Sequence, residues 1–210
     1  MRLGLLFVHG WALDHTLWDG VLAALGEDAS GAIVTDAGYY GAASSPPVSG
    51  GSWLGVGQSL GALELLAKPP PGLVGVVALD GFARFGRAAD FPEGVAPRVL
   101  QRMAAQLAQG ALAEFLARAG GEAPAGTPDV ARLTQGLDRL AALDGRACAL
   151  PVWRLHAQGD PIALTPATDA SFARMNVVER RIRPALDHLS PVHDPAGCAD
   201  LVRAALKALS

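Results

Sequence analysis

The stretch GVGQSLGALELL, residues 55–66, places Ser59 between two glycines, one lying two residues before it and the other two residues after it. An apolar run precedes the serine and apolar residues at helical spacing follow it, so it is expected at a turn from a strand into a helix. The pattern G-x-S-x-G in that setting exposes the serine side chain on a sharp turn. The glycines let the strand and the helix approach, and the N–H groups at the helix start favour negative charge beside the serine. The pattern therefore predicts Ser59 as a nucleophile.

Around this turn, short apolar runs alternate with longer segments of helical period. Such alternation is typical of a mostly parallel sheet with helices on both faces. The runs predicted as strands are residues 3–8, 32–36, 53–57, 73–79, 151–156 and 176–182. The helices expected between and after them are residues 18–25, 60–67 and 196–209. The sequence therefore predicts an α/β fold with a compact sheet of about six strands.

Residues 83–148 break this alternation because they contain no convincing strand. Apolar residues recur at helical spacing after Pro97, which fits the first turn of a helix. A second helix is expected from Asp129, as its N-cap, to Leu143, after a Gly/Pro-rich loop. We therefore predict a helical cap at residues 83–148, inserted into a core made of residues 1–82 and 149–210.

Composition limits the classes of protein that fit the chain. With 210 residues, half of them hydrophobic, and a formal net charge of −3, the sequence favours one folded domain and argues against a nucleic-acid partner. The first apolar run is too short to span a membrane and lacks a signal cleavage site, so a cytoplasmic protein is expected. Cys148 and Cys198 are far apart and have no histidine pair nearby, which argues against a metal site and a disulfide.

A nucleophilic serine needs a base and a carboxylate that orients the base. His188 lies between the last predicted strand and the last predicted helix, where its loop can reach Ser59. His193 is the alternative, although it directly precedes the final helix. Asp160 follows the fifth predicted strand and is the expected carboxylate, and Asp80, at the end of the strand before it, is the alternative.

Acyl transfer to a serine also needs two N–H donors for the oxygen that gains charge in its tetrahedral intermediate. Leu60 supplies one at the start of the helix that follows the serine. The loop after the first predicted strand supplies the other, because Gly10 allows a close turn that can present the backbone N–H of Trp11.

Four segments together resemble the α/β-hydrolase fold: FVHGWALDHTLW, GQSLG, PVWRLHAQGDPIALTP and HLSPVHDPA. More narrowly, they resemble the pimeloyl-[acyl-carrier protein] methyl ester esterases of biotin synthesis. The resemblance implies a catalytic triad of Ser59, Asp160 and His188, with Trp11 and Leu60 as oxyanion donors. It also implies carboxylesterase activity on the methyl ester of a pimeloyl chain carried by acyl carrier protein, without a metal or an organic cofactor.

The sequence departs from the pattern of this family in three ways. The strand that carries HGW lies almost at the start of the sequence, so the first two strands of the fold are expected to be missing. Residues 37–52 leave little room for a helix before the strand that leads to Ser59. Gln58 stands where the family usually has an aromatic residue, and the likeness is poor over the cap.

The cap suggests how an acidic carrier protein would bind. Arg98 and Arg102 are four residues apart on one expected helix, and Arg132 and Arg139 are seven apart on the other. Each pair could present a cationic patch to the carrier or to its phosphopantetheine group. Alternatively, the arginines are solvated charges on the helix faces, balanced by nearby acidic residues.

Apolar cap residues are candidates for lining an acyl channel between the cap and the sheet, or for packing inside the cap: Leu107, Phe115 and Leu116. Two other functions fit the same triad or the same fold. The first is a carboxylesterase or thioesterase with broad specificity for small esters. The second is a ligand-binding protein without catalytic activity on a hydrolase scaffold.

Overall fold

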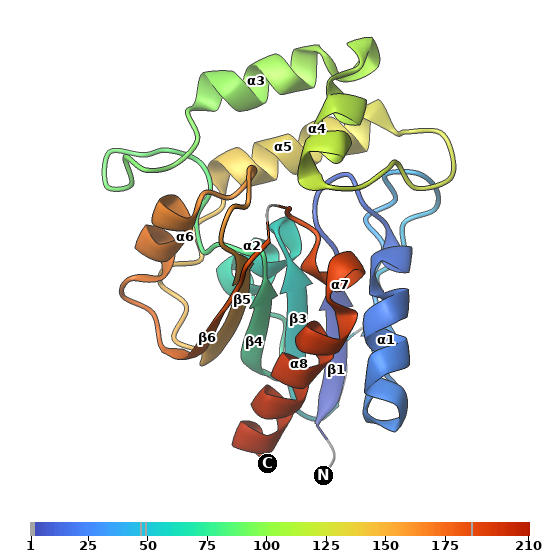
Figure 1. Cartoon of the computed structure of the whole chain (residues 1–210), viewed down its shortest axis with the longest axis vertical. Helices are drawn as coiled ribbons and strands as arrows, with labels where there is room; N and C mark the ends of the chain where they lie inside the picture. The colour runs from blue at the N-terminus through green and yellow to red at the C-terminus, as the bar shows by residue number, and fades with distance from the viewer. Residues whose placement is uncertain (1–2, 47, 49, 186) are drawn as a thin grey trace.

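The computed structural model describes residues 3–46, 48, 50–185 and 187–210. One sheet runs through it in the order β2-β1-β3-β4-β5-β6, and all of its neighbouring strands are parallel (Figure 1). The strands are β1 (Gly4–Val8), β2 (Ile33–Val34), β3 (Trp53–Gln58), β4 (Leu73–Leu79), β5 (Val152–Ala157) and β6 (Val177–Arg183). The predicted α/β fold with six parallel strands is confirmed.

Helices cover both faces of the sheet and its carboxyl edge (Figure 1). The core helices are α1 (Asp19–Leu25), α2 (Leu60–Ala67), α6 (Thr165–Phe172), α7 (Ser190–His193) and α8 (Pro195–Leu209), with the 3-10 turns η1 (His15–Trp18) and η2 (Gly26–Ala29). Above the carboxyl ends of the strands lie α3 (Pro97–Ala105), η3 (Leu107–Gln109), α4 (Ala111–Ala119) and α5 (Val130–Ala142). None of the helices in the described ranges is long and apolar enough to cross a bilayer.

Alternating side chains of the strands fill two hydrophobic clusters, one on each face of the sheet. Leu5 and Phe7 of β1 join the cluster that contains Val202 of α8, and Leu6 joins the cluster that contains Leu65 of α2. Side chains of a strand alternate between its faces, so a run that is apolar throughout is typical of a strand buried on both sides. The first cluster continues into the cap helices, which joins the cap to the core.

Several elements differ from the prediction, and two of them, the helices α6 and α7, were not among the predicted helices. The second strand is only Ile33–Val34, because Asp36 leaves the ladder and forms an isolated antiparallel bridge with Ser44. The first cap helix is divided into α3 and α4, because Gly110 adopts a left-handed conformation with a φ of 102° after η3. Other bounds agree with the prediction to within one or two residues, and the limits of the cap as a domain stay a prediction.

The second cap helix begins as the sequence indicates. The Asp129 carboxylate accepts a hydrogen bond from the Arg132 N–H at 3.0 Å, so Asp129 is the N-cap of α5. Pro97 is the first residue of α3, where a missing N–H costs nothing.

Candidate active site

Ser59 stands on a tight turn between β3 and α2. Its φ of 52° and ψ of −118° are unusual for a residue with a side chain and store strain at this position. A Cβ on Gly57 would overlap the Ala62 backbone, and a Cβ on Gly61 would overlap the Val8 carbonyl. The strand and the helix therefore approach as closely as the glycines permit, which is the contact expected from the sequence.

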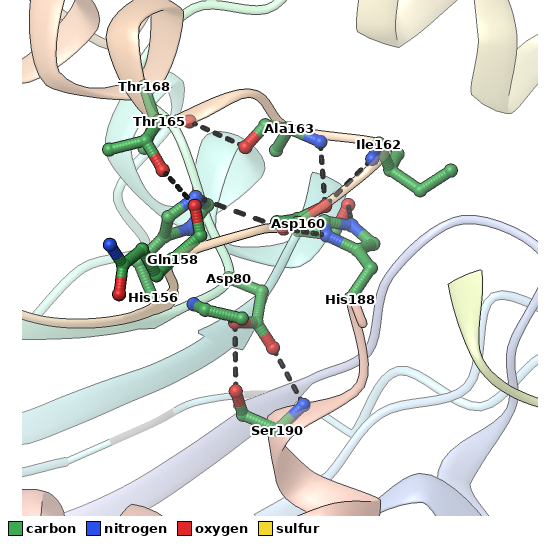
Figure 2. A network of polar contacts seen from close by, with 12 residues as sticks. Asp80, His156, Gln158, Asp160, Ile162, Ala163, Thr165, Thr168, His188 and Ser190 are labelled. Atoms are coloured by element: carbon green, nitrogen blue, oxygen red, sulfur yellow. Dashed lines mark hydrogen bonds and ion pairs between the residues drawn. The ribbon is translucent and has the colours of Figure 1, made fainter. Parts of the chain in front are cut away.

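Three buried side chains meet at this turn. His188 Nε2 lies 2.8 Å from Ser59 Oγ, and His188 Nδ1 lies 2.6 Å from Asp160 Oδ2. The second oxygen of Asp160 accepts hydrogen bonds from the Ile162 and Ala163 N–H groups at 2.8 and 2.9 Å (Figure 2). In this geometry His188 can take the Ser59 proton while Asp160 fixes the tautomer of the imidazole and stabilises its charged form.

Burial and nearby carboxylates act in opposite directions on His188. Burial lowers the pKa of His188, but the charge of Asp160, its hydrogen bond and the charge of Asp80 outweigh burial, so the pKa lies above the usual 6.5. A base with a raised pKa accepts a proton more readily once it is neutral. The site therefore favours proton transfer from Ser59 to His188.

Asp80, the alternative carboxylate, binds the segment after His188 rather than its ring. Its oxygens accept hydrogen bonds from the Ser190 N–H at 2.7 Å and the Ser190 hydroxyl at 2.8 Å (Figure 2). A third, longer bond of 3.3 Å comes from the Ala157 N–H. Burial raises the pKa of Asp80 to about 6. Asp80 thus anchors the start of α7, and Asp160 is the partner of the imidazole.

His193, the alternative base, and the strand residue His156 make no contact with Ser59 among the described residues. His193 is at the end of α7, and its Nε2 lies 2.9 Å from the Gly120 carbonyl. The N-cap of α8 is Asp194, whose carboxylate accepts from the Gly197 N–H. His156 is buried in β5, with Nε2 3.9 Å from Asp160 Oδ2, beyond hydrogen-bonding distance. Burial lowers the pKa of His156 to about 4, so its ring is neutral at pH 7.

Asp80, His156 and Asp160 offer potential metal ligands within 4.8 Å of one another. Their carboxylates already accept hydrogen bonds, Asp160 from His188 and Asp80 from Ser190. A cation placed among them would compete with the bond that orients the imidazole. The cluster therefore fits a hydrogen-bond network better than a metal site.

The two predicted oxyanion donors lie beside Ser59. Leu60 is the first residue of α2, so its N–H has no acceptor within the helix. Gly10 lies so close to the serine turn that a Cβ on it would be 3.0 Å from Ser59 Cβ. Trp11 and Ser59 line the same cavity. Both backbone segments are thus placed against the nucleophile.

His9 has a role that the sequence reasoning missed. Its Nε2 accepts from the Ala37 N–H at 2.9 Å, so Nδ1 carries the proton and donates to the Gly10 carbonyl at 2.8 Å. Burial lowers the pKa of His9, which keeps the ring neutral. A trans peptide directs its C=O and N–H in opposite directions. By holding the Gly10 carbonyl, His9 therefore also fixes the direction of the Trp11 N–H, and its place in HGW was the signal for this role.

A cavity of about 590 Å³ opens between the cap and the sheet, with Ser59 in its wall. Its lining is mostly apolar and includes Phe115. Leu107 and Leu116 are instead buried in the hydrophobic core and are not among the lining residues, which agrees with the packing alternative and not with their place as substrate-binding candidates. Besides Phe115, the larger apolar cap residues that line it are Phe85, Val95, Val99, Leu100, Met103, Leu137 and Leu140.

The two predicted pairs of arginines have different surroundings. Arg102 lines the cavity, whereas Arg98 is exposed on α3 and lies outside the lining. Arg132 Nη1 donates to the Ala37 carbonyl at 3.1 Å, and Arg139 Nη1 lies 2.9 Å from the Glu64 carboxylate. These two side chains bind α5 to the core, which corrects the prediction that they face a substrate.

Comparison with known proteins gives one curated relative, and no family model matches the chain. The chain is similar to the Biotin biosynthesis bifunctional protein BioHC of Cellvibrio japonicus (strain Ueda107), with 27% identity over 202 residues. The match covers 81% of this chain and 40% of that protein, so the chain spans less than half of the relative's length.

Several solved structures resemble the chain over nearly its whole length. An esterase from Exiguobacterium antarcticum has a TM-score of 0.77 at 13% identity, with 98% of this chain and 92% of that chain covered. A lipase-esterase related protein from Clostridium acetobutylicum ATCC 824 has a TM-score of 0.70 at 17% identity, covering 96% and 93%. The enol-lactonase from Burkholderia xenovorans LB400 has a TM-score of 0.71 at 15% identity, covering 99% and 92%. At these identities the likeness establishes architecture alone: the chain has the α/β-hydrolase fold.

Proposed function

We propose that the protein is a serine hydrolase that cleaves carboxylic esters. The observation that carries this proposal is the buried chain of contacts from Ser59 Oγ to His188 Nε2, at 2.8 Å, and from His188 Nδ1 to Asp160, at 2.6 Å. The strained turn that holds Ser59 and the apolar cavity beside it support the same conclusion.

The proposed reaction proceeds through an acyl-enzyme. Ser59 Oγ attacks the ester carbonyl while His188 Nε2 takes the hydroxyl proton, and the N–H groups of Trp11 and Leu60 stabilise the oxyanion. His188 then gives the proton to the leaving alcohol as the ester C–O bond breaks. A water molecule attacks the acyl group, gives its proton to His188, and releases the acid when that proton returns to Ser59. Asp160 stays ionised throughout, and no step needs a metal or an organic cofactor.

For the substrate we propose the methyl ester of a pimeloyl chain on acyl carrier protein, the substrate class of the esterases that the motifs resemble. The likeness to the biotin protein from Cellvibrio japonicus supports this choice. The apolar cavity is of the size that binds small ligands, and Arg102 on its wall, with Arg98 on the same helix, offers positive charge to an acidic carrier.

A broad-specificity carboxylesterase or thioesterase for small esters is the second candidate. The observation that favours it is that Arg132 and Arg139 are committed to contacts with the core. Fewer cationic side chains are then available to hold a carrier protein.

The deciding experiment compares turnover of the carrier-linked methyl ester, the free monomethyl ester of pimelate and p-nitrophenyl esters. Ser59→Ala is the blank, and Ser52→Ala, an exposed serine, is the matched control. A strong preference for the carrier-linked ester, lost in Ser59→Ala alone, is the expected result. Turnover of small activated esters only would support the second candidate. If no ester turns over and an organophosphate does not label Ser59, the result would support the remaining alternative, a ligand-binding protein without catalytic activity.

A further inference from the structure

Gln58 lies at the centre of the site, although the proposed reaction gives it no role. It is the last residue of β3 and directly precedes Ser59, and its side chain is fully buried. Its Nε2 donates a hydrogen bond of 2.7 Å to the backbone carbonyl of His188, a residue 130 positions away. Gln58 therefore connects the serine turn directly to the histidine loop.

The same side chain also touches the turn that carries Trp11. The Gln58 Oε1 atom has no hydrogen-bond partner among the described residues, and a Cβ on Gly10 would overlap it. An unpaired buried carbonyl is costly, and an apolar side chain at this position would avoid that cost. The Gln58 amide contributes a hydrogen-bond donor, Nε2, which the His188 carbonyl requires because a carbonyl can only accept a hydrogen bond.

Both backbone groups of His188 are thus held from opposite sides. Its N–H donates to the Ala119 carbonyl at the end of α4, at 2.9 Å, and its carbonyl accepts from Gln58 at 2.7 Å. The direction of a side chain follows from the position of its backbone. The two bonds fix the His188 backbone, and with the ring contacts they place the imidazole between Ser59 and Asp160.

We propose that Gln58 is a positioning residue for His188. Its amide holds the His188 backbone so that Nε2 stays at Ser59 Oγ and Nδ1 stays at Asp160. This inference rests on the proposed function, because it takes His188 to be the base. Gln58 acts through His188 and needs no contact with the ester.

Gln58→Met removes the amide and keeps a side chain of similar length. We expect kcat to fall by about 10- to 100-fold, as for a catalytic group displaced by roughly 1 Å, while KM changes by less than about twofold. A looser contact with Asp160 also lets the pKa of His188 fall, so the acid limb of the pH profile moves to lower pH. Gln158→Met makes the same change at an exposed position near Asp160 and should leave kcat, KM and the acid limb of the pH profile unchanged.

Gln58→Glu gives a second, pH-dependent test. Its buried carboxyl group can donate to the His188 carbonyl only while it is protonated. Activity of this variant should therefore decline as the pH rises and the carboxyl ionises, whereas the unmodified protein keeps its activity once His188 is neutral. A profile of unchanged shape would contradict the proposal.

A readout independent of turnover is the NMR signal of the His188 Nδ1 proton, which is far downfield while it is bonded to Asp160. We expect this signal to weaken or shift in both Gln58 variants and to persist in Gln158→Met, with thermal unfolding used to check that each variant is folded. Unchanged kcat together with an unchanged signal would overturn the inference. If no ester turns over even in the unmodified protein, the proposed function fails, and the NMR comparison still decides the role of Gln58.

Discussion

Two buried carboxylates lie near one imidazole, and their hydrogen-bond partners separate their roles. Asp160 accepts from His188 Nδ1, whereas Asp80 is occupied by the N–H and the hydroxyl of Ser190. Both residues follow buried strands in the sequence, so position alone left Asp80 open as an alternative. The fold resolves the choice because it brings the loop after β5, rather than the end of β4, to the ring.

Substitution of each carboxylate should separate these roles. Asp160→Asn removes the acceptor that fixes the His188 tautomer, and we expect kcat to fall by about 10⁴-fold. Asp80→Asn should cost less than about 10-fold, because it leaves the acceptor of His188 Nδ1 in place and removes only the more distant charge of Asp80 and part of the anchor at Ser190. Steady-state kinetics of the two variants on one activated ester measures both effects. The reverse order of the two losses would make Asp80 the functional acid.

His156 makes stability depend on pH. Burial lowers the pKa of His156 to about 4 in the folded protein. As the pH falls, the unfolded chain therefore binds a proton at this residue near pH 6.5, whereas the folded chain binds it only near pH 4. Its contribution to stability is therefore fully present above pH 6.5 and is lost as the pH falls. His156→Leu removes this loss.

We expect the free energy of unfolding of the unmodified protein, relative to the His156→Leu variant, to fall by about 2 kcal/mol between pH 7 and pH 5. Urea unfolding of both proteins at the two pH values gives the difference. Because Asp80 and the other titrating groups are common to both proteins, their contributions largely cancel in it. A difference independent of pH would mean that His156 titrates normally in the folded protein.

At the scale of elements, the strands and the serine turn could be predicted because their signals are local. Apolar runs set the strands, and the glycines around Ser59 set the turn. The division at Gly110 was missed because helical spacing continues across it. The contact between Gln58 and His188 joins residues 130 positions apart, and no local pattern in one sequence carries that information.

The serine turn gives a prediction at the same scale. A Cβ on Gly61 would overlap the Val8 carbonyl, and backbone on both sides leaves no flexible atom to move. Gly61→Ala should therefore lower the free energy of unfolding by at least about 2 kcal/mol and displace Ser59 from His188. Gly41→Ala is the matched control, because its new methyl group meets nothing within 4 Å. Equal unfolding midpoints in urea for the two variants would contradict the tight turn.

At the scale of the whole molecule, α5 connects the cap to the loop after β1, which carries Trp11. The Trp11 Nε1–H donates to the Leu133 carbonyl at 2.8 Å, and the Trp11 ring packs edge-on against Phe115 of α4. Arg139 adds a contact with Glu64 of α2. The sequence shows the charge of these cap residues, but their partners depend on how the cap settles on the core. For this reason the sequence suggested Arg139 as part of a binding surface, whereas in the structure its side chain pairs with Glu64 and connects the cap to the core.

The ion pair between Arg139 and Glu64 predicts that Arg139 contributes to the stability of the fold. Burial raises the pKa of Glu64, and the charge of Arg139 partly offsets that effect. Arg139→Met leaves a largely buried carboxylate without its partner, so we expect the free energy of unfolding to fall by about 1–2 kcal/mol, a value limited by the partial exposure of the pair. Adding Glu64→Gln should restore most of that loss, because the uncompensated charge is gone.

Arg98→Met, a change at an exposed side chain on α3, should leave stability within about 0.5 kcal/mol. If a carrier protein binds the cap, Arg98→Met should raise KM for the carrier-linked ester and leave KM for small esters unchanged. Arg102→Met, on the cavity wall, should raise KM for the carrier-linked ester more than KM for small esters. Arg139→Met should leave both KM values unchanged while the protein is folded. Urea unfolding and the two-substrate assay together separate the arginines that hold the cap from those that are free to meet a partner. A rise in KM for the carrier-linked ester in Arg139→Met alone would reverse the assignment, because the link to Glu64 would then serve the carrier as well as the fold.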